Sequence, residues 1–302
     1  MTPEQPRHGE QPLLQTKVVV PQIPPEYVPR PRLTERIERG VKGPLTLLAI
    51  PVGFGKTNLL IEWAKQTNSS VAWLNVDGED NDVSRFFRYM IGALQVVFPG
   101  MAEETLDFIL SNKAGGVQIG LTLLINEIAE VPEEIVLILD DFQNLENATI
   151  LSNLDFLLKH IPQNLHLIIA SRKMPELDLT PLRAKGLVVE LSVDDLRFSS
   201  NEVALFCQQV MGLKLPPETI QALEKRTDGW VTALQMAAVS MGDHTDPSTL
   251  FTSMGGDTHY LVDYLAEEVL DQQPDEVRQF LLRSSVLDTL NSSLVEAVVK
   301  PE

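Results

Sequence analysis

The chain has 302 residues and a mass of 33.6 kDa, a length that corresponds to about two domains. Hydrophobic residues make up 44% and charged residues 22%, an ordinary balance for a globular protein with a sizeable core. The net charge is −18, and a surface this acidic argues against a stand-alone binder of DNA or RNA. The single cysteine, Cys207, excludes an internal disulfide and fits a reducing compartment.

The sequence contains no apolar run long enough to cross a bilayer. The longest strongly apolar runs, such as Ile135–Leu139, have the length of a strand, whereas a membrane helix needs about 20 residues. The N-terminus lacks the apolar core of a secretory signal, and Thr2 excludes myristoylation. We therefore expect a cytoplasmic protein without a membrane partner.

Residues 1–32 hold eight prolines, which block a regular helix or central strand and predict an extended arm. Residues 33–194 alternate apolar runs with helical periodicity, which predicts a parallel sheet covered by helices on both faces. The expected strands are Leu45–Ile50, Val71–Val76, Ile135–Leu139, Leu165–Ala170 and Leu187–Leu191. The expected helices are Thr57–Gln66, a helix capped by Asn81 or Asp82, Leu121–Ile128 and Ile150–His160.

An all-helical domain is predicted after the last strand, from about residue 195 to the end of the sequence. Ser199 and Glu202 form a capping box, and Gly229 is typical of a helix end. The expected helices cover Ala204–Met211, a segment from Pro217, a segment from Trp230, Tyr260–Leu270 and Glu276–Leu282.

The segment Pro51–Thr57 lies between a predicted strand and a predicted helix, which is the context of a phosphate-binding loop. Its glycines allow backbone N–H groups to turn toward phosphate oxygens, and the helix N-terminus adds a favourable dipole. Lys56 can reach the β- and γ-phosphates, and the Thr57 hydroxyl can hold Mg²⁺. Ile50 stands where such loops usually have their first glycine. The expected phosphate-binding residues are Gly53, Phe54, Gly55, Lys56, Thr57 and Asn58.

Two carboxylates follow the apolar strand Ile135–Leu139, at the edge of the sheet where phosphates bind in open α/β folds. We expect Asp140 to bind Mg²⁺ and Asp141 to polarise the attacking water. Many ATPases have glutamate at the second position, so the shorter aspartate predicts slow hydrolysis. Arg172 follows the strand Leu165–Ala170 at the same edge, and we expect it to stabilise charge in the transition state.

Further short segments accompany these motifs along the chain: Thr16-Lys17, Val28–Leu33, Trp73-Leu74, Asp80–Asp82, Leu139–Phe142, Ser171-Arg172, Asp195–Phe198, Asp228–Trp230 and Tyr264–Leu270. With them, the chain resembles the N-terminal ATPase region of the MalT-like, LuxR-type ATP-dependent transcriptional regulators. These regulators belong to the signal-transduction ATPases with numerous domains (STAND). The P-loop is the most specific single motif, and the combination is more specific still.

The resemblance implies an AAA-like (ASCE) P-loop NTPase domain over residues 33–194, a small helical domain over 195–274 and the start of a winged-helix domain over 275–302. It also implies a switch, in which ADP holds a closed monomer and ATP with an inducer opens it to self-associate. The sensor repeats and helix-turn-helix of the family lie outside these residues. We therefore expect a fragment of a longer regulator, whose small-molecule or protein inducer and whose DNA bind through regions outside this chain.

The resemblance also implies an adenine pocket, lined by Val28, Arg30 and Arg32 from the N-terminal arm. The helical domain of the family approaches the base through a Gly-x-Pro turn. That turn here reads Gly229-Trp230-Val231, so Val231 takes the position of the proline. The implied cofactors are ATP or ADP with Mg²⁺.

Alternative functions remain open from the residues alone. A motor or loader ATPase acting on a polymer would share the fold, although the net acidity disfavours a basic channel. A scaffold with a vestigial P-loop would not need Lys56, Thr57 and Asp140, which are intact. A small-molecule kinase would need an acceptor pocket that no motif indicates.

Overall fold

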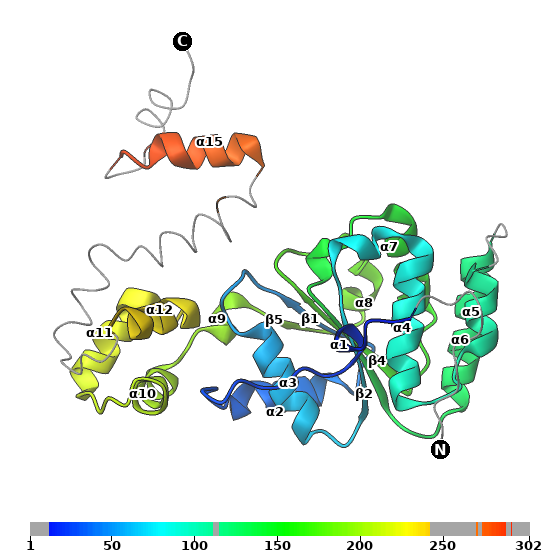
Figure 1. Cartoon of the computed structure of the whole chain (residues 1–302), viewed down its shortest axis with the longest axis horizontal. Coiled ribbons are helices and arrows are strands. Elements are labelled where there is room, and N and C mark those ends of the chain that lie inside the picture. Colours follow the sequence, from blue (N-terminus) through cyan, green and yellow to red (C-terminus); the bar gives the residue numbers. More distant parts are fainter. Residues whose placement is uncertain (1–11, 111–114, 242–269, 271–273, 288–290, 292–302) are drawn as a thin grey trace, which may run out of the picture.

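The computed structural model describes residues 12–110, 115–241, 270, 274–287 and 291. A parallel sheet of five strands, in the order β2-β3-β4-β1-β5, forms its centre (Figure 1). Each predicted strand is confirmed to within one residue at either end. The strands are β1 (Leu45–Ala49), β2 (Ser70–Asn75), β3 (Ile135–Asp140), β4 (Leu165–Ser171) and β5 (Val188–Leu191).

Helices cover both faces of the sheet, as predicted, and further helices follow it in the chain (Figure 1). Those before and around the sheet are α1 (Gln15–Val18), α2 (Pro31–Gly40), α3 (Lys56–Gln66), η1 (Gly78–Asn81), α4 (Val83–Val97), α5 (Glu103–Leu110), α6 (Gly116–Glu130), η2 (Phe142–Asn144), α7 (Ala148–Lys159) and α8 (Thr180–Ala184). Those after it are α9 (Val193–Leu196), α10 (Ser200–Gln209), α11 (Pro217–Thr227), α12 (Val231–Met241) and α15 (Asp275–Ser284).

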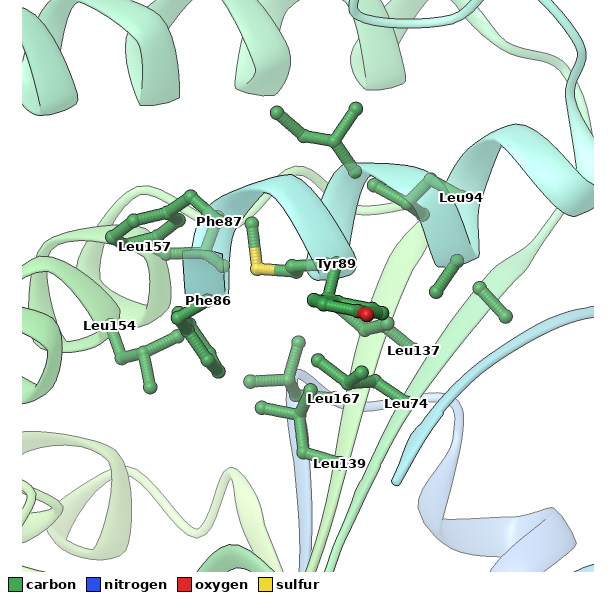
Figure 2. Packing of buried hydrophobic residues seen from close by; sticks show 14 of the residues in the cluster. Leu74, Phe86, Phe87, Tyr89, Leu94, Leu137, Leu139, Leu154, Leu157 and Leu167 are labelled. Atoms are coloured by element: carbon green, nitrogen blue, oxygen red, sulfur yellow. The ribbon is translucent and has the colours of Figure 1, made fainter. Parts of the chain in front are cut away.

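Every residue of β3 and β4 is buried, because successive side chains point to opposite faces and both faces are covered. On one face, Leu137 and Leu167 pack with Phe86 of α4 and Leu154 of α7 (Figure 2). The Asp82 carboxylate accepts a hydrogen bond from the backbone N–H of Arg85, so it caps α4 as predicted.

The opposite face of the sheet is covered by α2 and α3. Val136 and Ile138 of β3 pack there with Trp63 of α3 and with Leu33 and Ile37 of α2. The sheet thus has a separate apolar core on each face, and α3, which follows the P-loop, is fixed on one of them.

The prediction of an arm without helix over residues 1–32 is wrong at two places. The single turn α1 forms in the interval free of proline between Pro12 and Pro21, and α2 begins at Pro31, because proline fits the first position of a helix. The arm also packs on the domain, since Val18 is buried and Lys17 forms ion pairs in the loop after β2.

The helices after β5 form their own small apolar core. The predicted capping box of Ser199 and Glu202 is confirmed, although α10 begins at Ser200, four residues before the expected Ala204. Phe206, Leu223 and Leu234 of α10, α11 and α12 pack together in this core. The predicted helix over Tyr260–Leu270 lies outside the described residues, except for its last position. Among the described residues, no helix is long and apolar enough to cross a membrane.

Candidate nucleotide site

The P-loop connects β1 to α3 at the carboxyl end of the sheet. Gly53 and Gly55 adopt φ values of +84° and +78°, which side-chain-bearing residues rarely adopt. A Cβ on Gly55 would contact nothing within 4 Å, so only backbone conformation demands glycine there. A Cβ on Gly53 would lie 2.4 Å from Thr232 Oγ1 and 2.5 Å from Trp230 Nε1, so the helical domain also demands glycine at this position.

Three predicted site residues meet below the loop. The Thr57 hydroxyl donates a hydrogen bond to Asp140 Oδ2 at 2.8 Å, and Lys56 Nζ donates to the carbonyls of Ile50 (2.6 Å) and Pro51 (3.0 Å). Burial lowers the pKa of Lys56 to about 8. Burial, with the adjacent charge of Asp141, raises the pKa of Asp140 to about 6. An additional cation or a proton is therefore favourable at this carboxylate.

The donor set at this point fits Mg²⁺. Thr57 and Asp140 offer a hydroxyl and a carboxylate oxygen at the ends of adjoining elements, and oxygen ligands are those that Mg²⁺ prefers. Mg²⁺ in nucleotide-binding proteins is usually held by one or two carboxylates together with substrate phosphates. Two protein ligands at this position are therefore enough for a magnesium site.

Asp141 and Arg172 lie on neighbouring strand ends and are linked by a residue that the motifs did not indicate. Asp141 has a left-handed backbone (φ 53°), and its Oδ1 accepts a hydrogen bond from Gln143 Nε2 at 2.9 Å. The side-chain oxygen Oε1 of Gln143 accepts a hydrogen bond from the backbone N–H of Arg172 at 2.9 Å. Gln143 therefore joins the loop after β3 to the loop after β4.

The start of α12 lies directly on the P-loop. Trp230 Nε1 donates to the carbonyl of Val52 at 3.2 Å, and the Thr232 hydroxyl donates to the carbonyl of Gly53 at 3.0 Å. The Phe54 and Trp230 rings lie beside each other, with centroids 6.5 Å apart. The helical domain thus contacts the loop that is expected to hold phosphate.

The residues predicted for the adenine pocket divide into two groups. Val28 is buried in the core of the helical domain, and Val231 packs against the same core, so the structure brings these two together. Arg30 and Arg32 instead form ion pairs with Glu202, at 3.2 and 3.0 Å. Their role at adenine remains a prediction.

Arg30 is 1% exposed and connects the N-terminal arm to the sheet domain and to the helical domain. Its backbone N–H donates to Glu62 of α3, and its guanidinium donates to the carbonyl of Leu196 at 2.7 Å. Burial lowers the pKa of Arg30, which the Glu202 carboxylate partly offsets. Burial acts to raise the pKa of Glu202, but hydrogen bonds and the charges of both arginines hold it below its usual range. Glu202 was predicted only as a helix cap.

A groove of about 590 Å³ lies elsewhere, on the outer surface of α2 and α3. It is lined by residues such as Glu38 and Trp63 and contains none of the predicted site residues. The site predicted for nucleotide is therefore the P-loop edge of the sheet rather than this groove.

Comparison with known proteins identifies the relatives of this chain. A family model described as the MalT winged helix domain matches residues 266–302. The chain is 32% identical over 270 residues, 89% of its length, to the HTH-type transcriptional regulator MalT of Yersinia pestis. It is 32% identical over 282 residues, 92% of its length, to the serine/threonine-protein kinase PknK of Mycobacterium tuberculosis. The chain spans 30% and 25% of the lengths of these two relatives.

Two solved structures share the fold. The Walker-type ATPase of Pyrococcus abyssi matches with a TM-score of 0.56 at 17% identity, over 90% of this chain and 83% of that chain. A STAND protein with a tetratricopeptide repeat sensor from Pyrococcus horikoshii matches with a TM-score of 0.54 at 17% identity, over 92% of this chain and 37% of that chain.

The fold and the site define the class as the P-loop NTPase fold, with a phosphate-binding loop after β1 and acidic residues after β3. Within that class, the chain is similar to the MalT regulators over 89% of its length, its residues 266–302 match the MalT winged helix family, and it shares its fold with a STAND protein. The predicted family and fold are thereby confirmed. The domain boundaries at residues 32, 194 and 274 stay predictions.

Proposed function

We propose that this chain is a nucleotide-dependent switch that binds ATP or ADP with Mg²⁺ and couples slow hydrolysis to opening and self-association. The observation that carries the proposal is the contact of Trp230 and Thr232 with the P-loop. A switch needs two states that bind its ligand differently. A nucleotide at this loop lies where the sheet domain meets the helical domain, so its phosphates can bias the arrangement of the two.

The residues of the loop supply the contacts that bind phosphate. Backbone N–H groups of the loop and the N-terminus of α3 hold phosphate oxygens. Lys56 exchanges the carbonyls of Ile50 and Pro51 for phosphate oxygens, which are stronger partners because they are charged. Thr57 and Asp140 would hold Mg²⁺, which neutralises charge on the phosphates when bound.

Hydrolysis depends on the neighbouring strand ends. Asp141 orients the attacking water, and Gln143 fixes the carboxylate that does so. Arg172 stabilises the charge that develops on the transferred phosphoryl group. The short side chain of Asp141 places its carboxylate further from the phosphate than glutamate would, which makes hydrolysis slow.

The test is the nucleotide content of freshly purified protein, released by heat or acid. We expect stoichiometric ADP, and a larger assembly on exchange to a slowly hydrolysed ATP analogue in sedimentation. Lys56→Ala removes the phosphate partner and should abolish both, whereas Lys65→Ala, at the exposed end of the same helix, should change neither. A protein that is empty and does not bind added ATP or ADP with Mg²⁺ would contradict the proposal and favour a scaffold.

A further inference from the structure

Two loops that follow neighbouring strands are joined by one side chain at the carboxyl end of the sheet. We call residues 76–82, after β2, the β2 loop, and residues 141–147, after β3, the β3 loop. The β3 loop contains Asp141 and Gln143, whereas the β2 loop contains none of the predicted site residues. Because Asp82 caps α4, the side chain of Asn81 serves another purpose.

The side-chain amide of Asn81 uses its full capacity for hydrogen bonds. Its Nδ2 donates to the carbonyl of Asn144 at 2.7 Å and to the carbonyl of Gly78 at 3.1 Å. Its Oδ1 accepts from the backbone N–H groups of Glu146 at 2.8 Å and Asn147 at 3.1 Å. Both amide protons and both lone pairs of the oxygen are thus used. Three of the four bonds go to the β3 loop.

Further hydrogen bonds extend this connection to the acidic residue expected to act on water. Asn147 Nδ2 donates to the carbonyl of Asn81 at 2.8 Å, and Asn144 Nδ2 donates to the carbonyl of Val76 at 2.9 Å. The backbone N–H of Asn144 donates to the carbonyl of Asp141 at 3.1 Å, so one residue connects Asn81 to Asp141. Asp141 has a left-handed backbone, which a residue with a side chain keeps only where its surroundings hold it.

The β2 loop is itself fixed on the domain. The buried carboxylate of Asp80 accepts a hydrogen bond from the backbone N–H of Asp77 at 2.9 Å. It also forms ion pairs with Lys17 at 2.6 Å and Arg85 at 3.2 Å. Since a positioning group is only as accurate as its own support, these bonds matter for the next residue in the chain, Asn81.

We infer that Asn81 is a positioning residue for ATP hydrolysis, which holds the β3 loop so that the Asp141 carboxylate faces the attacking water. This inference rests on the proposed function and extends it to a residue outside the nucleotide site. Asn81 acts through the backbone of the β3 loop, whereas Lys56 and Thr57 belong to the P-loop. Its loss should therefore slow the hydrolysis step and leave nucleotide binding unchanged.

The test is the rate of the hydrolysis step in a single turnover. ATP with a labelled γ-phosphate is bound without Mg²⁺, Mg²⁺ starts the reaction, and phosphate is measured after an acid quench, so slow release of ADP does not affect the rate. Asn81→Ala removes three bonds to the β3 loop. A displacement of about 1 Å can slow a reaction about 100-fold, so a partial loss of position should slow this step about tenfold. The Kd of a slowly hydrolysed ATP analogue with Mg²⁺ should change less than about twofold.

Asn164→Ala is the matched control. Asn164 Nδ2 donates to the carbonyls of Ile128 and Val131, both at 2.7 Å, at the amino end of the sheet. Its replacement removes comparable hydrogen bonds away from the β3 loop and should leave the rate of hydrolysis unchanged. Asn144→Ala removes a single side-chain bond between the two loops and should slow the step about threefold.

Each outcome decides between the positioning role and its alternatives. A wild-type rate in Asn81→Ala, or an equal loss of rate in Asn164→Ala, would overturn the role of Asn81 and leave the switch intact. If Asn81→Ala does not fold, a wild-type rate in Asn144→Ala would overturn it. A Kd that rises as much as the rate falls would assign Asn81 to nucleotide binding instead. A wild-type chain that binds no nucleotide, or binds ATP with Mg²⁺ without hydrolysing it, would overturn the proposed function and the inference with it.

Discussion

Replacement of Glu202 by alanine should destabilise the chain far more than removal of any exposed ion pair. The side chains of Arg30 and Glu202 are 2% and 8% exposed, so the variant leaves a guanidinium buried without its counter-charge. Removing one partner of a buried pair costs about 3–5 kcal/mol, and the carbonyl partners of Arg30 favour the lower value. Loss of the capping carboxylate beside Ser199 adds about 1 kcal/mol. We expect a total of about 4 kcal/mol.

The assay is the free energy of unfolding in urea, with the thermal midpoint as a second measure. A loss of this size should lower the midpoint by about 6 °C for a chain of 302 residues, because the entropy of unfolding is about 2.1 cal/mol/K per residue. Ser199→Ala removes only the capping hydroxyl and should cost about 1 kcal/mol. Glu190→Ala removes the half-exposed partner of Arg183 and should cost less than about 1 kcal/mol.

The pH dependence of the Glu202 pair provides an internal check. Because the folded-state pKa of Glu202 lies below its ordinary 4.5, the contribution of the ionised carboxylate is fully present above that value. It is lost as the pH falls through the lowered folded-state pKa. The reasoning is wrong if Glu202→Ala costs no more than Ser199→Ala at neutral pH.

Two further predictions concern a buried histidine and the link between the strand ends. Burial lowers the pKa of His166 to about 4, so the unfolded state binds more protons than the folded state between about pH 4 and 6.5. The free energy of unfolding should therefore fall by about 3 kcal/mol as the pH drops through that window. His166→Gln should flatten this dependence in urea unfolding at pH 7.5, 5.5 and 4.5, and an unchanged pH dependence would contradict the role of His166. Gln143→Leu removes the hydrogen bond that fixes Asp141, so kcat for ATP hydrolysis should fall about tenfold while the Kd for nucleotide changes less than about twofold. A rise in Kd as large as the fall in kcat would assign Gln143 to nucleotide binding instead.

The sheet and the P-loop could be predicted because their signals are local. β3 and β4 are uniformly apolar, as strands buried on both faces must be, and the loop motif lies between a strand and a helix in the chain. By contrast, α2 is rich in charged residues and begins at Pro31, at the end of the proline-rich segment. Leu33 and Ile37 lie four residues apart on its buried face, and the proline content of the preceding segment obscured this helical spacing.

The contacts between the domains could not be predicted from pattern. Trp230 donates to the carbonyl of Val52, 178 residues away, and every residue has a carbonyl, so no residue type marks the acceptor. Glu202 had a local explanation as a helix cap, which hid its second role as the partner of Arg30 and Arg32. Such pairings depend on how the domains are placed relative to each other. Local residue patterns in one sequence do not indicate that placement.

The contacts of Val28 and Arg30 with the helical domain have a consequence for the order of folding during synthesis. Arg30 emerges from the ribosome 172 residues before Glu202, an interval of roughly 10–30 s at the usual rates of translation. During that time the guanidinium can be solvated but not paired, and Val28 has no apolar core to enter. The part of the arm around Val28 and Arg30 can therefore take its final place only after the helical domain has been made, although it precedes the whole sheet in the chain.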